Sequence, residues 1–210
     1  VVTSVRGAGR RVALTFDDCN SGSAWGKILQ ALDAAEAAAT FFCPGPRVLA
    51  NPALARRTVR DGHAVGSHGW DHADMRYLSA EQIRSRLRRD EAAWWRTTGA
   101  MAVPLFRPPY GSLDDGARAA AGSAGYAWIA LWSVDPRDWE LPGTGVIASR
   151  VLGPIHAGSI VVMHVNPQTA AALPAILRGL RARDLQPVTL LDLLANASSV
   201  EPGRVQRMPV

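Results

Sequence analysis

Lysine is almost absent from this chain: Lys27 stands alone among 23 lysine and arginine residues. The formal net charge is nevertheless +5 at pH 7, because arginine supplies the rest of the positive charge. The basic run at 84–89 lies in a helical stretch that also contains Glu81, Asp90 and Glu91, and such mixed charge is typical of a solvated helix face. We therefore expect no nucleic-acid partner.

The sequence also has no long hydrophobic run, internal repeat or low-complexity linker. No apolar run reaches the roughly 18 residues that a membrane span needs, although 48% of the 210 residues are hydrophobic, so we expect no membrane span. The start lacks the basic and apolar segments of a secretion signal, which is therefore expected to be absent from this sequence. This length and composition fit one globular domain over 1–210, with its core at about 11–194, and we expect a monomer.

Histidine is scarce as well, with five residues in the chain, yet two of them are spaced four apart as His68 and His72. Earlier in the chain, the apolar run 12–16 ends at two adjacent aspartates, Asp17 and Asp18. Two ionised carboxylates side by side repel each other unless a positive charge compensates them or one stays neutral. Aspartate with two histidines is a zinc-type ligand set, and three protein ligands leave one coordination position open for water. Taken singly, however, an aspartate pair also caps helices, and one such histidine spacing can arise by chance.

Short apolar runs alternate with helical periodicity from end to end, a pattern that predicts parallel β/α construction. The expected strands are 12–16, 39–43, 64–67, 105–107, 126–132, 159–163 and 186–189. The expected helices lie near 25–38, 51–61, 79–98, 113–124, 146–152 and 169–183, followed by a short terminal helix. Ser79 and Gln82 form a capping-box pattern at the start of the long helix, and the tail after Asn196 is expected to be frayed.

Polar residues follow the predicted strands at or just past their carboxyl ends. These residues are Asp17, Asp18, His68, His72, Arg107, Asp135, Asp138 and His164. In a parallel barrel the carboxyl ends of the strands share one face, on which active sites are built. The common position therefore predicts a single site, and it makes His164 a candidate site residue rather than an ordinary core histidine. Asp135, His63 and His156 are interpreted as loop or structural residues.

The chain resembles the polysaccharide deacetylases with a NodB-type catalytic domain, carbohydrate esterase family 4, over about residues 11–194. Five motifs of that family appear in order, namely Thr15-Phe-Asp17-Asp18, His68-x-x-x-His72, Arg107-Pro-Pro-Tyr-Gly111, Asp135-x-x-Asp138-Trp139 and Val162-Met-His164. The resemblance implies an α/β fold, a distorted (β/α) barrel of about seven parallel strands with its active site at the strand carboxyl ends. It also implies a divalent metal, usually zinc, with Co²⁺ or Ni²⁺ as alternatives, and the removal of acetyl groups from carbohydrate polymers.

The resemblance further implies individual roles. Asp18, His68 and His72 would bind the metal, and Asp17 would be the general base that deprotonates the attacking water. Zinc lowers the pKa of bound water from about 16 towards 7, so a carboxylate can complete the deprotonation. Arg107 would pair with Asp17 and keep it ionised.

The remaining motif residues would act on the leaving group and the acetyl group. The backbone N–H of Tyr110 would stabilise the oxyanion together with the metal. His164 would protonate the amine leaving group, and a contact with Asp138 would raise the pKa of its imidazole. Trp139 and Val162 would line a pocket for the acetyl methyl group, although each could instead be a core residue.

Three positions depart from the family pattern. Cys19 replaces the usual glycine after the aspartate pair, Gly69 replaces serine or threonine after the first metal histidine, and Val165 replaces the aspartate that often follows the last histidine. None of them removes a metal ligand. Gly69 and Val165 could nevertheless loosen the support around the ligands, so the rate and the metal affinity are less well defined than the reaction type.

The chain has two cysteines, Cys19 beside Asp18 and Cys43 at the end of the second predicted strand. Neighbouring strands lie about 4.8 Å apart, within the Cα separation that a disulfide needs. A Cys19–Cys43 disulfide would remove a soft thiolate that competes for zinc, and it would fit a secreted protein. The alternative is two buried thiols that only pack.

The sequence therefore predicts a metal-dependent hydrolase that removes acetyl groups from a polysaccharide. N-acetylglucosamine in peptidoglycan or chitin-like glycans is favoured, because a cationic surface suits an anionic cell wall, and a secreted or wall-associated bacterial location is expected. The alternatives are an acetylxylan O-esterase of the same fold and a non-catalytic carbohydrate-binding barrel. A glycosidase is a further alternative, but neighbouring residues of one strand project to opposite sides, which fits poorly with two carboxylates flanking one bond.

Overall fold

Seven parallel strands form the centre of the fold in the computed structural model, which describes residues 1–195 and 199–202. They are β2 (Arg11–Asp17), β3 (Thr40–Phe42), β4 (Ala64–Gly66), β5 (Leu105–Phe106), β6 (Trp128–Ile129), β7 (Ile160–His164) and β8 (Gln186–Val188). β2 pairs with β3, β7 and β8, β3 pairs with β4, and β5 pairs with β6. Single bridges, Ser67 to Phe106 and Val134 to Val161, join the β5–β6 side to the rest. The predicted distorted (β/α) barrel is confirmed, with one side of the ring held only by isolated bridges.

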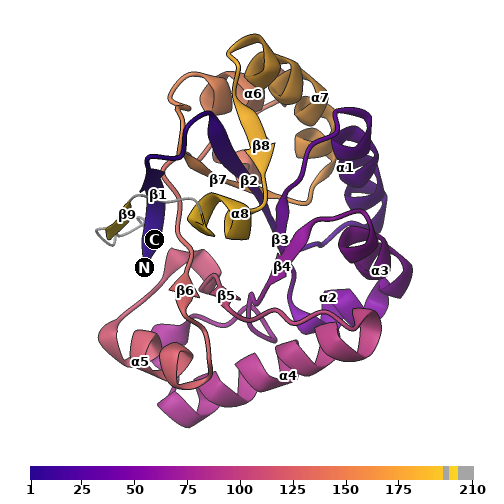
Figure 1. Cartoon of the computed structure of the whole chain (residues 1–210). Helices are drawn as coiled ribbons and strands as arrows, with labels where there is room; N and C mark the ends of the chain where they lie inside the picture. Colours follow the sequence, from indigo (N-terminus) through magenta and orange to yellow (C-terminus); the bar gives the residue numbers. More distant parts are fainter. Residues whose placement is uncertain (196–198, 203–210) are drawn as a thin grey trace.

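Helices surround this ring of strands (Figure 1). They are α1 (Gly22–Ala34), α2 (Gly45–Ala50), α3 (Pro52–Arg60), α4 (Ala80–Thr98), α5 (Asp115–Ser123), α6 (Thr144–Leu152) and α7 (Pro167–Ala182). Short 3-10 helices, η1 (Met75–Tyr77), η2 (Pro109–Gly111) and η3 (Asp138–Glu140), lie in the connections. Within the described residues, no helix combines the length and the apolar character needed to cross a membrane.

The two-residue period of β2 separates the outside of the barrel from its interior. Every second residue packs outwards, in a cluster shared with α1 and α7, namely Val12, Leu14 and Phe16. Ala13 instead clusters with Ile160 of β7 and with Leu190 of helix α8 (Leu190–Ala195), which lies across the ring in Figure 1. Helix α8 therefore fills the barrel near the amino ends of the strands. Thr15 and Asp17 share the inward side of β2 with Ala13, so Asp17 faces the interior at the opposite end.

The structure adds a strand pair that the sequence did not indicate. β1 (Val2–Arg6) runs antiparallel to β9 (Ser199–Pro202), beside the barrel (Figure 1). Val2 and Val5 are buried in the same cluster as α8, although the core was expected to begin near residue 11. The expectation of a frayed tail is wrong for residues 199–202, because they pair with β1, whereas 196–198 and 203–210 lie outside the described residues.

Smaller differences follow from proline. Helix α2 has no counterpart among the predicted helices, and Pro46 lies in its first turn, where a missing N–H needs no helical partner. β5 ends before Arg107, because Pro108 follows directly and cannot donate to a strand neighbour. The start of α4 is as predicted: Ser79 and Gln82 form both hydrogen bonds of the capping box.

Candidate active site

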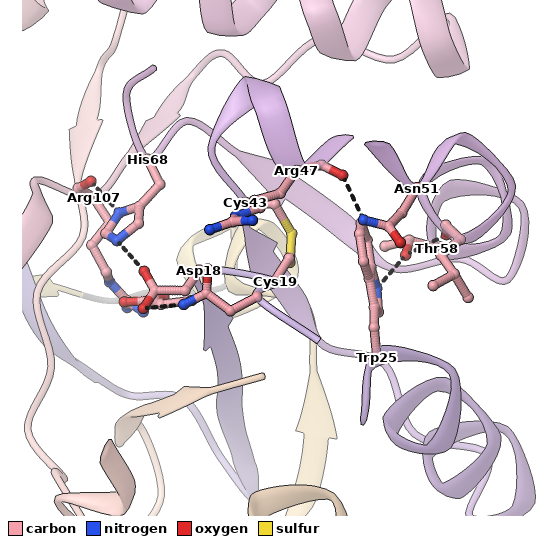
Figure 2. Close-up of a disulfide and its surroundings, with 12 residues drawn as sticks. Asp18, Cys19, Trp25, Cys43, Arg47, Asn51, Thr58, His68 and Arg107 are labelled. Atoms are coloured by element: carbon pink, nitrogen blue, oxygen red, sulfur yellow. Dashed lines mark hydrogen bonds and ion pairs between the residues drawn. A yellow bond between two sulfur atoms is a disulfide. The ribbon is translucent and has the colours of Figure 1, made fainter. Parts of the chain in front are cut away.

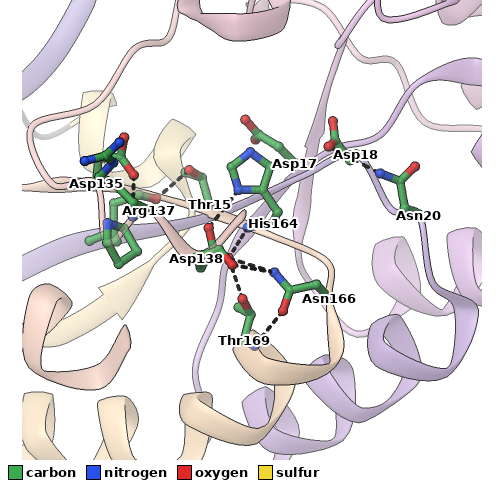
Figure 3. Close-up of polar contacts among 12 residues, drawn as sticks. Thr15, Asp17, Asp18, Asn20, Asp135, Arg137, Asp138, His164, Asn166 and Thr169 are labelled. Carbon is green, nitrogen blue, oxygen red and sulfur yellow. Dashed lines mark hydrogen bonds and ion pairs between the residues drawn. The ribbon is translucent and has the colours of Figure 1, made fainter. Parts of the chain in front are cut away.

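The predicted site residues gather at the carboxyl ends of the barrel strands. Asp17 ends β2 and His164 ends β7, and the two are register neighbours. His68 follows β4 and Arg107 follows β5. Asp138 lies in η3, beyond β6, and contacts His164 (Figure 3). The structure therefore brings residues from five parts of the sequence to one face of the barrel.

One aspartate and two histidines form a cluster suited to a cation. Asp18 Oδ1 lies 3.1 Å from His72 Nε2 and 3.4 Å from His68 Nε2, and one ligand atom of each residue lies within 4.8 Å of the others. His68 Nδ1 is 2.8 Å from the carbonyl oxygen of Arg107, which can only accept, so Nδ1 donates and Nε2 presents a lone pair to the cluster (Figure 2). Asp18 Oδ1 is buried and has no hydrogen-bond partner in the described part of the chain. An orphaned carboxylate oxygen facing two imidazole nitrogens fits a zinc-type divalent cation.

The two histidines are brought together by a loop rather than by a helical turn. Gly69 has a φ of 74° and His72 a φ of 54°, both in the left-handed region. The rings of His68 and His72 consequently meet edge to face, with centroids 5.0 Å apart. A Cβ at position 69 would lie 2.8 Å from Cε of Met75, so glycine suits this backbone and serine or threonine would be strained there.

Both aspartates of the pair face the site in Figure 3, although they are consecutive in sequence. β2 ends at Asp17, and Asp18 turns away from the strand with a φ of 71°, so the opposite projection expected of two neighbouring strand residues does not apply to this pair. Their partners nevertheless differ. Asp17 is ion-paired with Arg107, whereas Asp18 faces the histidines with Oδ1 and accepts a hydrogen bond from Asn20 with Oδ2 at 3.3 Å. The two carboxylates are therefore prepared for different tasks.

Arg107 is fully buried and fixes Asp17 in place. Its Nη1 donates to Asp17 Oδ1 at 2.8 Å and to Thr15 Oγ1 at 2.6 Å. The other guanidinium nitrogens donate to the carbonyl oxygens of Ala130 and Leu131. Sequence reasoning missed Thr15, although it lies two residues before Asp17 and hence on the same side of β2. This arrangement fixes a buried carboxylate beside a permanent positive charge.

Asp138 holds His164 with both carboxylate oxygens. Oδ1 lies 2.7 Å from His164 Nδ1, and Oδ2 accepts the backbone N–H of His164 at 2.7 Å. Asn166 and Thr169, at the start of α7, also donate to Oδ2 (Figure 3). Burial acts to lower the pKa of the His164 imidazole, but the hydrogen bond and charge of Asp138, aided by the charges of Asp17 and Asp18, raise it to about 9. With this pKa, the His164 imidazole is charged at neutral pH.

We expect Asp138→Asn to lower the pKa of His164 from about 9 towards or below the ordinary value of about 6.5. Asparagine still offers a hydrogen-bond acceptor, but the carboxylate charge is lost, so the opposing effect of burial prevails. An NMR titration of the imidazole in metal-free protein measures the midpoint. The signal of the exposed His156 in the same spectra is the internal reference. An unchanged His164 midpoint would contradict this account of its charge.

The same shift predicts how stability depends on pH. A histidine whose pKa is raised in the folded state stabilises the fold fully below about pH 6.5, and that contribution is lost as the pH rises through about 9. The wild-type protein should therefore lose more unfolding free energy than Asp138→Asn over this window. Urea unfolding at the two ends of the window checks the difference.

The three residues expected around the acetyl group lie in different environments. Tyr110 has a φ of 60°, is 56% exposed and packs edge-on against His72, with ring centroids 4.6 Å apart. Trp139 is 48% exposed, which excludes the core alternative for it. Val162 is buried, and it lies two residues before His164 on the same side of β7. Tyr110 and Trp139 are thus available to a ligand, whereas Val162 is available only from within the site.

Cys19 and Cys43 are joined by a disulfide, with their Cα atoms 5.2 Å apart (Figure 2). Cys43 directly follows β3, and the N–H of Asp18 donates to the carbonyl oxygen of Phe42 at 3.1 Å. The covalent bond and this hydrogen bond together hold the segment carrying Asp18 against the end of β3. Neither sulfur is then a free thiolate beside the Asp18–His68–His72 cluster.

The residues interpreted as structural are not part of the Asp18–His68–His72 cluster. Asp135 accepts the N–H of Arg137 at 2.7 Å, a common role of aspartate in loops. His63 is buried, neither ring nitrogen has a hydrogen-bond partner among the described residues, and burial lowers the pKa of its imidazole. His156 is exposed beside the carbonyl oxygen of Ala157. None of these observations gives them a part in the site.

The sequence profile described as polysaccharide deacetylase matches residues 4–129. The chain belongs to this family. Peptidoglycan-N-acetylglucosamine deacetylase PgdA of Listeria monocytogenes is 35% identical over 185 residues, which cover 88% of this chain and 39% of that protein. The chain therefore spans well under half the length of this relative. Peptidoglycan-N-acetylglucosamine deacetylase of Bacillus cereus is 34% identical over 189 residues, which cover 87% of each chain.

Solved structures of the family superpose closely on the chain. A CE4 family pseudoenzyme from Bacillus anthracis matches with a TM-score of 0.83 and 30% identity, covering 88% of this chain and 65% of that one. A mutant of the same pseudoenzyme with restored enzymatic activity also gives a TM-score of 0.83, at 32% identity, covering 88% of this chain and 67% of that one. Since this fold is shared by a pseudoenzyme and its reactivated mutant, activity depends on the side chains of the site rather than on the fold.

Proposed function

We propose that this polysaccharide deacetylase family member removes acetyl groups from N-acetylglucosamine residues of a cell-wall glycan with the help of a divalent metal. The proposal rests on one observation: the Asp18–His68–His72 cluster shares one face with the Asp17–Arg107 and His164–Asp138 pairs. Amide hydrolysis needs a positive charge beside the carbonyl oxygen, a base for water and an acid for the amine. This face offers residues suited to each task.

Asp18, His68 and His72 would hold the metal, and zinc is the ion that best suits one carboxylate and two imidazole nitrogens. When bound, it supplies Lewis acidity, which polarises the acetyl carbonyl and acidifies the attacking water. In this proposal Asp17 accepts the proton of that water. Arg107 suits Asp17 to the task because it fixes the carboxylate in place through Oδ1 alone.

His164 would supply the proton that the amine nitrogen needs as the C–N bond breaks. Asp138 keeps the imidazole charged and, through two hydrogen bonds, fixes its direction. The backbone N–H of Tyr110 would donate to the oxyanion, and Trp139 and Val162 would border the acetyl methyl group. The exposure of Tyr110 and Trp139 supports contact with a polymer outside the barrel.

Two observations favour a peptidoglycan substrate over acetylxylan. Both relatives described above are named peptidoglycan-N-acetylglucosamine deacetylases, and the net charge of +5 suits an anionic wall. The Cys19–Cys43 disulfide is stable in an oxidising environment, which supports a secreted or wall-associated location. The substrate and the location are parts of the same proposal.

Acetate release from defined polymers tests this function. Metal-free protein is supplied with zinc and assayed on peptidoglycan, chitin oligomers and acetylxylan. We expect release from the N-acetylated polymers to exceed release from acetylxylan, and to stop when a chelator removes the metal. Faster release from acetylxylan would identify an O-esterase, and cleavage of glycosidic bonds that ignores the chelator would identify a glycosidase.

A non-catalytic barrel is the second candidate function, and the pseudoenzyme among the structural neighbours favours testing it. Such a protein would bind glycan without releasing acetate from any of the three polymers. The same zinc-loaded sample therefore distinguishes the two functions when glycan pull-down is measured beside acetate release.

A further inference from the structure

The loop that carries both histidines is attached to helix α4 by a buried hydrogen bond. We define the ligand loop as residues 67–72. Ser67 begins it, and Ser67 Oγ lies 2.5 Å from Oδ2 of Asp90 in the middle of α4. The same hydroxyl accepts the N–H of Gly69 at 3.2 Å. Ser67 thus links the helix to the backbone on both sides of His68.

Two further side chains of α4 contact the ligand loop. Arg86 Nε donates to both carboxylate oxygens of Asp71, at 2.9 and 3.1 Å. The guanidinium of Arg89 lies over the ring of Trp70, 4.1 Å from its centroid. Positions 86, 89 and 90 are three and four residues apart and therefore lie on one side of the helix. One side of α4 consequently contacts the loop at one residue before His68 and at two residues between the histidines.

The exposure of the side chains distinguishes the Asp90–Ser67 hydrogen bond from the Arg86–Asp71 ion pair. Asp90 and Ser67 are fully buried, so a lost hydrogen bond there leaves an unsatisfied polar group that water cannot reach. The side chains of Arg86 and Asp71 are 23% and 43% exposed, and ion pairs in contact with solvent contribute little. Gly69, with its positive φ, has no side chain of its own to hold the loop. The Asp90–Ser67 hydrogen bond is therefore a stronger attachment of the ligand loop to α4 than the Arg86–Asp71 ion pair.

We propose that Asp90 is a positioning residue for the metal site, acting through Ser67 to hold His68 with Nε2 directed at Asp18. This inference rests on the metal site of the proposed function. It places a determinant of metal affinity on a helix that contributes no ligand. Groups that orient a metal-binding histidine commonly change metal affinity by about 10–100-fold when they are removed.

Zinc affinity of the full chain, measured by competition with a chromophoric chelator, tests the proposal. Asp90→Ala and Ser67→Ala should each weaken zinc binding by about 10–100-fold. Asp90→Asn should restore affinity close to that of the wild type, because its amide has the same size and can still hydrogen-bond Ser67. The double alanine variant should lose less affinity than the two single losses combined, because both substitutions remove the Asp90–Ser67 hydrogen bond.

Arg84→Ala is the matched control on the same helix. Arg84 pairs with Glu81 instead of the ligand loop, so its removal should leave zinc affinity unchanged. Thermal melting of each metal-free variant shows whether it folds. If Asp90→Ala does not fold, the comparison of Ser67→Ala with Asp90→Asn decides in its place, because both keep the volume of the core nearly constant.

Hydrogen exchange in metal-free protein separates this inference from the proposed function. We expect faster exchange in the ligand loop of Asp90→Ala, and no change around Arg84. If the wild type binds no zinc, the proposed metal site is wrong. The exchange result still tests whether Asp90 holds the ligand loop against α4. Wild-type zinc affinity and wild-type exchange in folded Ser67→Ala and Asp90→Ala would overturn the positioning role.

Discussion

Joint replacement of His68 and His72 by alanine should abolish stoichiometric zinc binding and acetate release together. The two Nε2 atoms are the nitrogen atoms that face Asp18 Oδ1, so the double variant keeps only one carboxylate ligand. The loss of zinc affinity should therefore exceed the roughly 100-fold loss that follows removal of a group that only orients a ligand. Acetate release should fall to the level of chelator-treated wild type. Zinc content after dialysis and acetate release on the same sample are the two measurements.

The control for this prediction is His156→Ala, which removes a histidine that is exposed and distant from the cluster in sequence. It should bind zinc and release acetate as the wild type does. The side chain of His68 is 3% exposed and that of His72 is 32% exposed, so His68→Ala alone should lose more thermal stability than His72→Ala alone. Full zinc occupancy in the double variant would remove the foundation of the proposed function.

Asp17→Asn should leave zinc bound and lower acetate release by about 10²–10⁴-fold, the range expected for loss of a general base. Asparagine has nearly the same shape and can accept the hydrogen bond of Arg107, but it takes up no proton at neutral pH. The prediction is checked by the turnover rate at saturating substrate, with zinc content measured on the same preparation. A variant that turns over at the wild-type rate would show that another group deprotonates the water.

This substitution also carries a stability cost that the assay must take into account. Arg107 is fully buried, and removal of one partner from a buried ion pair costs about 3–5 kcal/mol, although its hydrogen bonds to two backbone carbonyls remain. Assays therefore belong well below the melting temperature of the variant. Asp135→Asn is the matched control, because its amide oxygen can still accept the N–H of Arg137, and it should keep both activity and stability.

Site residues that directly follow apolar strands can be predicted from the sequence, because the carboxyl ends of parallel strands lie together at one end of a barrel. Asp17, His68, Arg107 and His164 were found in this way. The tautomer of His68 could not be predicted, since it depends on the carbonyl oxygen of Arg107, which the fold brings from the residue after β5. The role of Asp90 could not be predicted either. In the sequence it is one of several charged residues of a helix expected to be solvated, and only the fold shows that it is buried.

Pairings between distant segments could not be predicted from the sequence either. β1 and β9 lie at opposite ends of the described chain, and neither has the alternation or length that identifies a strand by itself. The left-handed conformations of Asp18 and His72 were also missed, because neither residue type requires a positive φ. In each case the missing information lies in a tertiary contact rather than in the local sequence.

The disulfide between Cys19 and Cys43 has a consequence for the order of maturation. Before it forms, the chain presents two thiols near Asp18, and thiolates bind zinc more readily than carboxylates do. Zinc arriving first would be captured in a cysteine-containing site, in which the sulfurs are no longer free to oxidise. Oxidation before metal loading leaves only the nitrogen and oxygen ligands. Recombinant protein should therefore be allowed to form its disulfide under chelation, and zinc should be added last.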